Sequence, residues 1–249
     1  MDEGISGKKE CRGKRYTMGK DVIVACDFSC AAKTLEFLDL FRERKPFVKI
    51  GMELFYAEGP DMVRRIKDRG HKIFLDLKLH DIPNTVRKAM AVLSRLDIDM
   101  CNVHAAGTVA MMEAALEGLV RDDGTRPLLI AVTQLTSTDQ ERLEKDLLIR
   151  EPMKEVVMHY AQNAKSAGLD GVVCSPLEAR TVHNACGNGF LTVTPGVRFA
   201  DSDKGDQKRV MTPAQARLEG SDYIVVGRPV TAAADPVAAY EKCVKEFCL

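Results

Sequence analysis

The chain has 249 residues, of which 45% are hydrophobic and 29% are charged, a composition typical of an ordinary globular protein. Its 36 Lys and Arg residues balance 36 Asp and Glu residues, so no excess of positive charge favours nucleic-acid binding as the main activity. No stretch approaches about 18 consecutive apolar residues, so the sequence predicts no membrane span. Any anionic ligand must be held by a local site.

Residues 1–20 carry six basic and three acidic side chains around Gly and Ser, without an apolar core. This pattern predicts a disordered basic extension and not a secretory signal. The eight cysteines include no Cys-x-x-Cys pair, and several lie in apolar runs, which is typical of buried, reduced thiols in a cytoplasmic protein. No linker rich in Gly, Pro or Ser divides residues 21–249, which predicts a single domain.

Short β-rich runs alternate with helical patterns from residue 21 onward. The predicted strands cover 21–27, 47–51, 72–78, 100–104, 127–133, 171–174, 190–194 and 223–227. The predicted helices cover 29–42, 61–69, 82–96, 108–120, 153–167, 177–185, 213–219 and 236–247. Eight β-then-α units predict a (β/α)8 TIM barrel, with a doubly wound sheet as the alternative. Two long connections, 134–151 and 198–212, are candidate lids.

The segment 72–78 places charges where packing favours aliphatic side chains. In a strand, the period of two puts Phe74, Asp76 and Lys78 on one face and Leu75 and Leu77 on the other. Asp81 follows just beyond the strand and would complete an Asp/Lys/Asp cluster. The segment therefore predicts a functional site.

Polar residues also end other predicted strands, at Asp27, Lys49 and His104. A parallel strand covered on both faces should be nearly all aliphatic, and the C-terminal ends of barrel strands meet at one rim that carries the active site. Each charge alone could be a solvated strand end. Together they predict one shared site.

Two structural interpretations of this cluster stay open. Asp81, before Ile82 and Pro83, would suit a helix N-cap, a role that is compatible with catalysis. Asp76 and Lys78 could form a structural ion pair, although such buried pairs are weak evidence for stability. The flanking carboxylates should raise the pKa of Lys78, which predicts a protonated acid and argues against Schiff-base chemistry.

A phosphate site is predicted after the last two strands, at 194–198 (Thr-Pro-Gly-Val-Arg) and 225–229 (Val-Val-Gly-Arg-Pro). Barrels often bind phosphate with these two loops, where Gly227 permits close approach and Arg228 offers a planar fork of donors. The alternative is a turn with an exposed arginine. No His-Glu-x-x-His or similar spacing occurs, so no metal site is predicted.

Residues 76–85 (Asp-Leu-Lys-Leu-His-Asp-Ile-Pro-Asn-Thr) resemble the Asp-x-Lys-x-x-Asp signature of the orotidine 5'-phosphate decarboxylase family. The runs 48–51, 131–137, 194–198 and 225–228 resemble its other blocks, in order, so that the resemblance extends from residue 21 to the C-terminus. It implies a (β/α)8 barrel that converts orotidine 5'-phosphate (OMP) to UMP and CO2 without a metal or an organic cofactor.

The resemblance also implies roles for individual residues. The catalytic residues would be Lys49, Asp76, Lys78 as proton donor, and Asp81 contributed by the partner subunit of a homodimer. Thr85 would reach the same neighbouring site. The remaining substrate contacts would be Asp27 and Lys49 on the ribose, Thr136 on the pyrimidine, and Arg198, Gln207, Gly227 and Arg228 on the phosphate.

Two rival functions remain. Sugar-phosphate enzymes of the same barrel group, such as 3-keto-gulonate-phosphate decarboxylase and hexulose-phosphate synthase, resemble the same signature and require Mg²⁺. The Ile-Pro-Asn-Thr run after Asp81 and the Gln-Leu-Thr-Ser run at 134–137 favour a pyrimidine instead. The second rival is a catalytically silent nucleotide-binding barrel, which would bind UMP without turnover.

Overall fold

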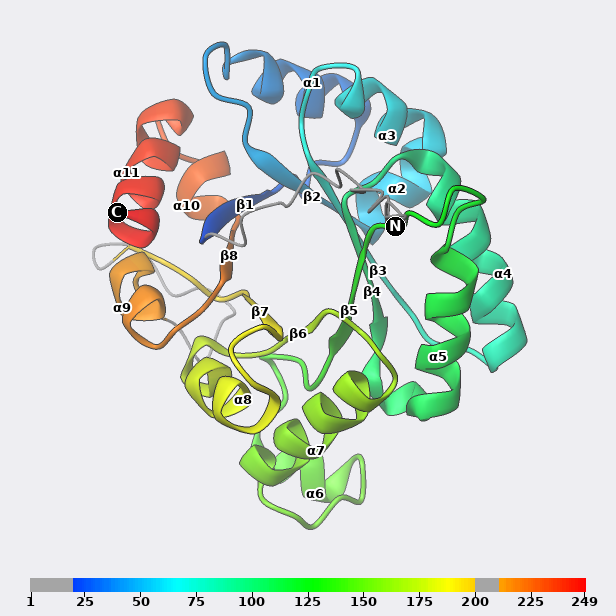
Figure 1. Ribbon diagram of the computed structural model, residues 1–249. Coiled ribbons are helices and arrows are strands. Elements are labelled where there is room, and N and C mark those ends of the chain that lie inside the picture. The colour runs from blue at the N-terminus through cyan, green and yellow to red at the C-terminus, as the bar shows by residue number, and fades with distance from the viewer. Residues whose placement is uncertain (1–19, 200–210) are drawn as a thin grey trace, which may run out of the picture.

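The computed structural model describes residues 20–199 and 211–249. Eight parallel strands close into a barrel in chain order, and Figure 1 shows the helices as a ring around it. The predicted TIM barrel is confirmed and the doubly wound sheet is wrong. The strands are Asp21–Ala25 (β1), Phe47–Gly51 (β2), Ile73–Leu79 (β3), Met100–His104 (β4), Leu128–Val132 (β5), Gly171–Val173 (β6), Leu191–Thr194 (β7) and Tyr223–Val226 (β8).

Eight helices correspond to the predicted ones. They are Ala31–Asp39 (α1), Pro60–Lys67 (α3), Pro83–Leu93 (α4), Thr108–Leu119 (α5), Met153–Ser166 (α7), Ala179–Cys186 (α8), Pro213–Leu218 (α9) and Pro236–Cys248 (α11). The sequence reasoning missed Met52–Glu58 (α2), Gln140–Lys145 (α6) and Arg228–Thr231 (α10), and the 3-10 turns Ser94–Leu96, Ala105–Gly107 and Pro176–Glu178. The missed helices have seven residues or fewer and so complete fewer than two turns, which leaves a weak 3.6-residue period. The connection 134–151 is therefore partly helical.

Two apolar layers hold the barrel. Alternate side chains of the strands point inward and fill its centre, while the others pack against the helices. The inner layer comprises Ile23, Ala25, Phe47, Phe74, Met100, Ile130, Val193 and Val225. Leu75 and Leu77 belong to the outer layer, so the predicted placement of Phe74 on the face opposite them is confirmed. Polar residues one pleat beyond this inner layer must face the C-terminal mouth of the barrel.

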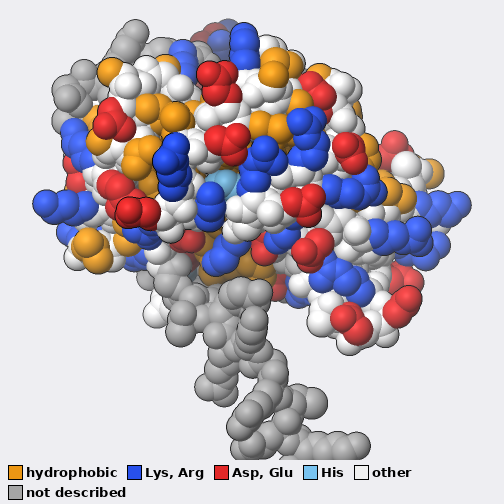
Figure 2. All heavy atoms as spheres, turned by 90° about the horizontal axis from the view of Figure 1, so that it is seen from above, with side chains coloured by type: hydrophobic (Ala, Val, Ile, Leu, Met, Phe, Trp, Pro, Cys, Tyr) orange, Lys and Arg blue, Asp and Glu red, His pale blue; other side chains and the backbone are white. Residues whose placement is uncertain are grey.

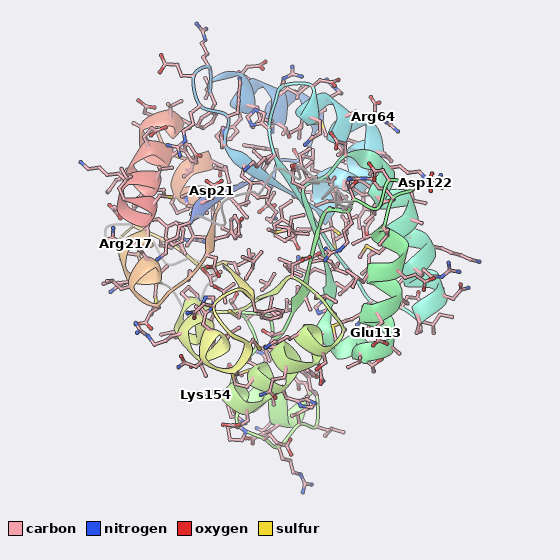
Figure 3. The ribbon with its side chains drawn as sticks, in the orientation of Figure 1. Asp21, Arg64, Glu113, Asp122, Lys154 and Arg217 are labelled. Atoms are coloured by element: carbon pink, nitrogen blue, oxygen red, sulfur yellow. The ribbon has the colours of Figure 1, made fainter. Side chains whose placement is uncertain are left out.

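The helices expose their charged faces. Arg64 of α3, Glu113 of α5 and Lys154 of α7 are exposed and lie on the outside of the ring (Figure 3). Basic and acidic side chains intermingle on the face shown in Figure 2, in keeping with the balanced charge. Within the described ranges, no helix combines the length and apolarity that a membrane crossing requires.

Several cysteines are core residues of this barrel. Cys26 follows β1 and Cys101 lies in β4, and both side chains are buried among apolar neighbours. Burial raises the pKa of each of these thiols to about 12. Both therefore stay protonated near neutral pH and pack as small apolar side chains, as the sequence predicts.

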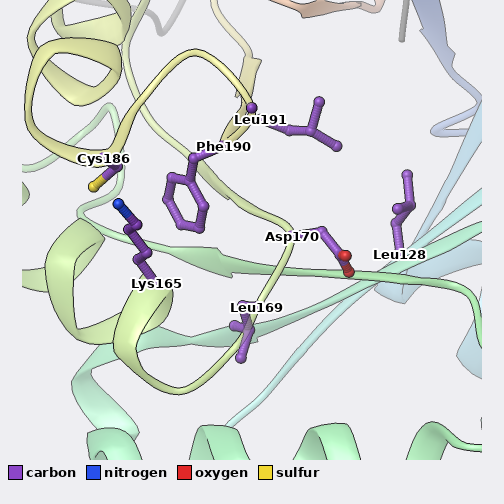
Figure 4. Close-up of a pocket in the computed structure, with 8 residues that line it drawn as sticks. Leu128, Lys165, Leu169, Asp170, Cys186, Phe190 and Leu191 are labelled. Atoms are coloured by element: carbon purple, nitrogen blue, oxygen red, sulfur yellow. The ribbon is translucent and has the colours of Figure 1, made fainter. Parts of the chain in front are cut away.

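The N-terminal end of the strands carries an ion pair. Arg126 binds Asp170 through two bonds, Nη1 to Oδ2 at 2.5 Å and Nη2 to Oδ1 at 3.0 Å, and Asp170 Oδ2 also accepts from the Leu129 N–H at 2.8 Å. Beside it lies a hollow of about 420 Å³ between the starts of β5 to β7 and the ends of α7 and α8 (Figure 4). In TIM barrels the N-terminal end of the strands contributes to stability, and the active site lies at the C-terminal end.

Replacing Arg126 with methionine should lower the free energy of unfolding by about 1–3 kcal/mol, because Asp170 loses a two-pronged partner in a partly buried place. Urea denaturation measures the loss. Arg64→Met is the matched control, since its pair with Asp61 is exposed and longer, at 3.6 Å. An equal loss of unfolding free energy in the two variants would contradict a stabilising role for the Arg126–Asp170 pair.

Candidate active site

Charged side chains from the first three strands meet at the C-terminal mouth of the barrel. Lys49 Nζ, on β2, donates to Asp27 Oδ1 at 2.9 Å and lies 3.4 Å from Asp76 Oδ2 on β3. Lys78 Nζ donates to the other oxygen of Asp76, Oδ1, at 2.7 Å. The four side chains form an array of alternating charge in the order Asp27, Lys49, Asp76, Lys78. The sequence predicted that these residues would meet, because they end neighbouring strands.

Packing positions the lysine at the centre of the array. All five residues of β2 are buried, and Lys49 shares the inward face with Phe47 of the inner apolar layer. Gly51 follows on the same face. A Cβ at this glycine would lie 3.1 Å from Asp27 Oδ1 and 3.2 Å from Lys49 Nζ, tighter than ordinary contacts. The glycine therefore leaves room for the Asp27–Lys49 pair.

Strand β3 is irregular where it carries the charges. Leu75 pairs with Cys101 of β4 and Leu79 pairs with Val103, so three residues, 76 to 78, stand opposite the single residue Asn102. Lys78 has a φ of 52°, the left-handed region. The strict period of two predicted for this strand therefore fails at Lys78, because of the bulge. Its ammonium nevertheless reaches Asp76.

The sequence reasoning missed Asn102. Its side chain is buried, its Oδ1 accepts from the Lys78 backbone N–H at 2.8 Å, and its Nδ2 donates to Asp76 Oδ1 at 2.7 Å. One signal was available, an amide in the middle of the strand 100–104, flanked by the apolar residues Cys101 and Val103. A buried amide must find partners, and here its partners are two residues of the charged array.

The array keeps its central members ionised. Burial opposes the charge on Asp76, but Lys49, Lys78 and the hydrogen bonds from Lys78 and Asn102 outweigh it, and the pKa of Asp76 lies below its usual value. Burial likewise opposes the charge on Lys49, but Asp76 and Asp27 hold the pKa of Lys49 above its usual value. A carboxylate and an ammonium are thus maintained in a largely dry place.

This shift predicts an acid-sensitive contribution to stability. Because the folded pKa of Asp76 is depressed, its contribution is present above the unfolded value of 3.8 and is lost as the pH falls below it. In that window the free energy of unfolding of the wild type should fall more steeply than that of Asp76→Asn, by up to about 1.4 kcal/mol per pH unit. Urea denaturation across this range measures both slopes. Asp61→Asn, at an exposed site, should keep the wild-type slope. Identical slopes in wild type and Asp76→Asn would contradict the shift.

Asp81 lies in the loop between β3 and α4, and the predicted N-cap role is wrong. The helix begins at Pro83, so Ile82 occupies the N-cap position, with no side-chain capping bond. Asp81 Oδ1 instead accepts from the adjacent Ile82 N–H at 2.6 Å. Asp81 is exposed, and among the described residues it forms no ion pair within its own chain. Thr85, in the first turn of α4, is exposed as well.

The remaining predicted substrate contacts follow strands at the same end of the barrel. Thr136 follows β5 and Arg198 follows β7, while Gly227 follows β8 and Arg228 is the first residue of α10. A bridge between Val197 and Met211, with the Arg198 N–H donating to the Met211 carbonyl at 3.0 Å, closes the base of the loop after β7. Gln207 and most of the candidate lid 198–212 lie outside the described residues.

Two histidines flank the array. The rings of His80, beyond β3, and His104, at the end of β4, have centroids 5.7 Å apart. Burial, and then the nearby His80 and Lys78, lower the pKa of His104 below its usual value. His104 therefore adds no positive charge to the site at neutral pH.

The donor set is poorly suited to a divalent cation. Both oxygens of Asp76 already face ammonium groups, which would repel a metal ion. Within 20–199 and 211–249, no three side chains of His, Cys, Asp or Glu come together as a metal-binding group. The chemistry that this arrangement offers is instead a fixed cation beside a fixed anion.

Comparison with known proteins shows the family to which the chain belongs. A family model described as "Orotidine 5'-phosphate decarboxylase / HUMPS family" matches residues 20–243. The chain belongs to that family. It is 59% identical over 226 residues to an orotidine 5'-phosphate decarboxylase of Streptococcus pyogenes serotype M3 (strain MGAS315), covering 90% of this chain and 96% of that protein. It is 53% identical over 233 residues to the one of Geobacillus sp. (strain WCH70), covering 92% and 98%.

Two solved structures share the barrel. The crystal structure of orotidine 5'-phosphate decarboxylase from Lactobacillus acidophilus superposes with a TM-score of 0.83 at 43% identity, covering 92% of this chain and all of that one. An uncharacterized conserved protein from Geobacillus kaustophilus gives 0.81 at 49% identity, covering 91% of this chain and 99% of that one. The predicted resemblance to the decarboxylase family is confirmed.

Proposed function

We propose that this protein is an orotidine 5'-phosphate decarboxylase, a carboxy-lyase that converts OMP to UMP and CO2. The observation that carries the proposal is the alternating array of Asp27, Lys49, Asp76 and Lys78 at the mouth of the barrel. The names of the two curated relatives, at 53% and 59% identity, support it.

The chemistry requires a cation at one carbon atom. When the bond from C6 of the pyrimidine to the carboxylate breaks, its electron pair stays on C6, where no neighbouring group can delocalise it. The Lys78 ammonium can stabilise this developing charge and then transfer a proton to C6, leaving an amine that solvent reprotonates. Its bond to Asp76 at 2.7 Å fixes the ammonium before substrate arrives. Lys78 is thus assigned the roles of electrostatic stabiliser and general acid.

The rest of the substrate is assigned to the surrounding loops. Asp27 and Lys49 would hold the ribose hydroxyls, and Thr136 the pyrimidine. Arg198, Gly227 and Arg228, which follow the adjacent strands β7 and β8, would bind the phosphate together with Gln207. The phosphate is remote from C6. Its binding energy can drive closure of the 198–212 connection and so raise kcat as well as lower KM.

We infer a homodimer in which Asp81 and Thr85 reach the neighbouring active site. Asp81 is exposed beside the signature and lacks an ion pair within its own chain among the described residues. Exposed apolar side chains lie near the same end of the barrel, with Ile82 66%, Tyr56 71% and Met52 44% exposed. Burying such residues against a second copy would remove apolar surface from water.

The test is a spectrophotometric assay of OMP loss by the purified protein with EDTA present. Undiminished turnover supports the proposal. Activity that EDTA abolishes and Mg²⁺ restores, or turnover of a keto-sugar phosphate instead, would favour the sugar-phosphate enzymes. Binding of UMP without any turnover of OMP would identify a silent barrel.

Arg228→Ala should weaken transition-state binding by about 2–5 kcal/mol, seen as a lower kcat/KM, because one partner of a desolvated charge pair is removed. Steady-state kinetics with OMP measures it. Arg95→Ala, at an exposed site after α4, is the matched control and should behave as wild type. An unchanged kcat/KM in Arg228→Ala would mean that the phosphate binds elsewhere.

A further inference from the structure

Asn102 lies opposite the bulge that carries the reactive lysine. In β3, residues 76 to 78 face this single residue of β4, so the regular ladder of backbone hydrogen bonds is interrupted there. Asn102 is only 1% exposed, so leaving its side-chain amide without hydrogen-bond partners would be costly. Its amide therefore has to be satisfied by the bulge itself.

The two bonds of this amide join both parts of the Lys78–Asp76 pair. Asn102 Oδ1 accepts the Lys78 backbone N–H at 2.8 Å, and Nδ2 donates to Asp76 Oδ1 at 2.7 Å. The same Asp76 oxygen accepts from Lys78 Nζ at 2.7 Å. The three residues form a closed ring of contacts. In this ring Asn102 binds the backbone N–H of Lys78 and the carboxylate of Asp76, which is the counter-ion of Lys78.

Only one orientation of the amide fits these partners. Turning the amide over would place NH2 against the Lys78 N–H and the carbonyl oxygen against the Asp76 carboxylate. Both contacts would then be repulsive. The arrangement also demands a residue with one donor and one acceptor on a short side chain, which an apolar strand residue could not supply.

The backbone of Lys78 needs such support. Its φ of 52° lies in the left-handed region, which is unfavourable for a residue with a side chain and persists only where surrounding contacts impose it. The Asn102 carbonyl supplies the acceptor for the N–H that the bulge removes from the ladder. Without it, the backbone of Lys78 can relax and carry the ammonium away from its set position.

We propose that Asn102 is a positioning residue for the decarboxylation, which fixes the Lys78 ammonium and the Asp76 carboxylate relative to C6 of the substrate. The inference rests on the proposed function, since it assigns Asn102 to the same reaction. It extends that function to a buried residue to which no substrate contact has been assigned. The alternative is that Asn102 only stabilises the fold, as any satisfied buried amide would.

Asn102→Asp separates the two roles by pH. A neutral carboxyl group reproduces the amide, because its carbonyl accepts the Lys78 N–H and its hydroxyl donates to Asp76. An ionised one places two carboxylates together, which raises the pKa of the pair and disturbs the array. The groups around position 102 include Asp76 and Lys78 of β3, Lys49 of β2 beyond Asp76, His104 of β4 with His80, and the apolar Ile130 of β5.

The experiment measures kcat and KM for OMP from pH 6 to 9 for wild type, Asn102→Asp and Asn102→Ser. At the alkaline end, kcat of Asn102→Asp should be roughly 100-fold below wild type, the loss typical of a misplaced catalytic group. Its kcat relative to wild type should recover at least about tenfold as the carboxyl group takes up a proton at lower pH. Asn102→Ser, which is too short to make both bonds, should lose a similar factor at every pH. KM should stay within about threefold of wild type, because the assigned phosphate contacts are distant.

Thr192→Val is the matched control, since Thr192 is also fully buried in a strand and hydrogen-bonded, but toward the opposite end of the barrel, to Asp222. It should lower Tm without lowering kcat. The inference fails if both Asn102 variants keep kcat within about twofold of wild type, or if Asn102→Asp shows no dependence on pH beyond that of wild type. If Asn102→Asp does not fold, the kcat of Asn102→Ser decides. Absence of OMP turnover in the wild type would instead remove the proposed function itself.

Discussion

Lys78→Ala should lower kcat for OMP by at least about 10⁴-fold, because one change removes both the cation and the proton donor. The phosphate and base contacts assigned to other loops remain, so the variant should still bind UMP with a Kd within about tenfold of wild type. Assays of OMP loss over long incubation times measure the residual kcat. Isothermal titration calorimetry measures the Kd for UMP. The two readouts together separate a lost reaction from a lost fold.

Lys165→Ala is the matched control for this variant. Lys165 is an exposed lysine in the last turn of α7, beside the hollow at the other end of the barrel (Figure 4). It should keep the kcat and UMP affinity of wild type. A wild-type-like kcat in Lys78→Ala would remove Lys78 from the mechanism, whatever the behaviour of the control.

Mixing the inactive Lys78→Ala and Asp81→Ala proteins should restore activity if Asp81 serves the neighbouring site. Each heterodimer then contains one site with both residues intact and one site with neither. Random exchange makes about half of the dimers heterodimers, so roughly one quarter of all sites should recover. Activity measured after exchange, with the heterodimer fraction confirmed by native mass spectrometry, tests this number. If Asp81 acted within its own chain, both sites of every heterodimer would be dead and no activity would return.

A chain carrying both substitutions provides the control for subunit exchange. Mixed in equal amounts with wild type, it should reduce activity to about one quarter of that of an all-wild-type sample, because only wild-type homodimers retain complete sites. Simple dilution without sharing would leave about one half. A shared site requires both results: recovery of about one quarter of the sites in the first mixture, and a fall to about one quarter of the activity in the second.

The fold could be predicted because its signals are local. Eight β-rich runs alternate with helical patterns, and several predicted strands match the observed ones within one residue at each end, such as β2 and β4. The polar strand ends then identified the array, because parallel barrel strands bring their C-terminal ends to one rim. The role of Thr136 came from the family resemblance alone, whereas the phosphate loops with Gly227 and Arg228 were also predicted from their place after the last two strands. All of these roles stay predictions.

The geometry of β3 could not be predicted in this way. Its bulge and the positive φ of Lys78 depend on a contact with β4 that is distant in sequence, and period-two reasoning assumes a regular strand. Asn102 escaped attention for the same reason, because its role appears only once β3 and β4 are paired. The N-cap interpretation of Asp81 failed because the helix begins one residue later than that role requires, at Pro83. Tertiary contacts between β3 and β4 decided the first two.

The central claim is that this chain removes CO2 from OMP and delivers a solvent-exchangeable proton to C6. Turnover of OMP labelled with ¹³C in the carboxyl group, carried out in D2O and followed by NMR, tests it most directly. The account predicts one labelled CO2 for each UMP formed, with deuterium at C6, and no detectable product from Lys78→Ala in the same time. Unchanged OMP with the wild-type protein, or UMP formed equally well by Lys78→Ala, would contradict it.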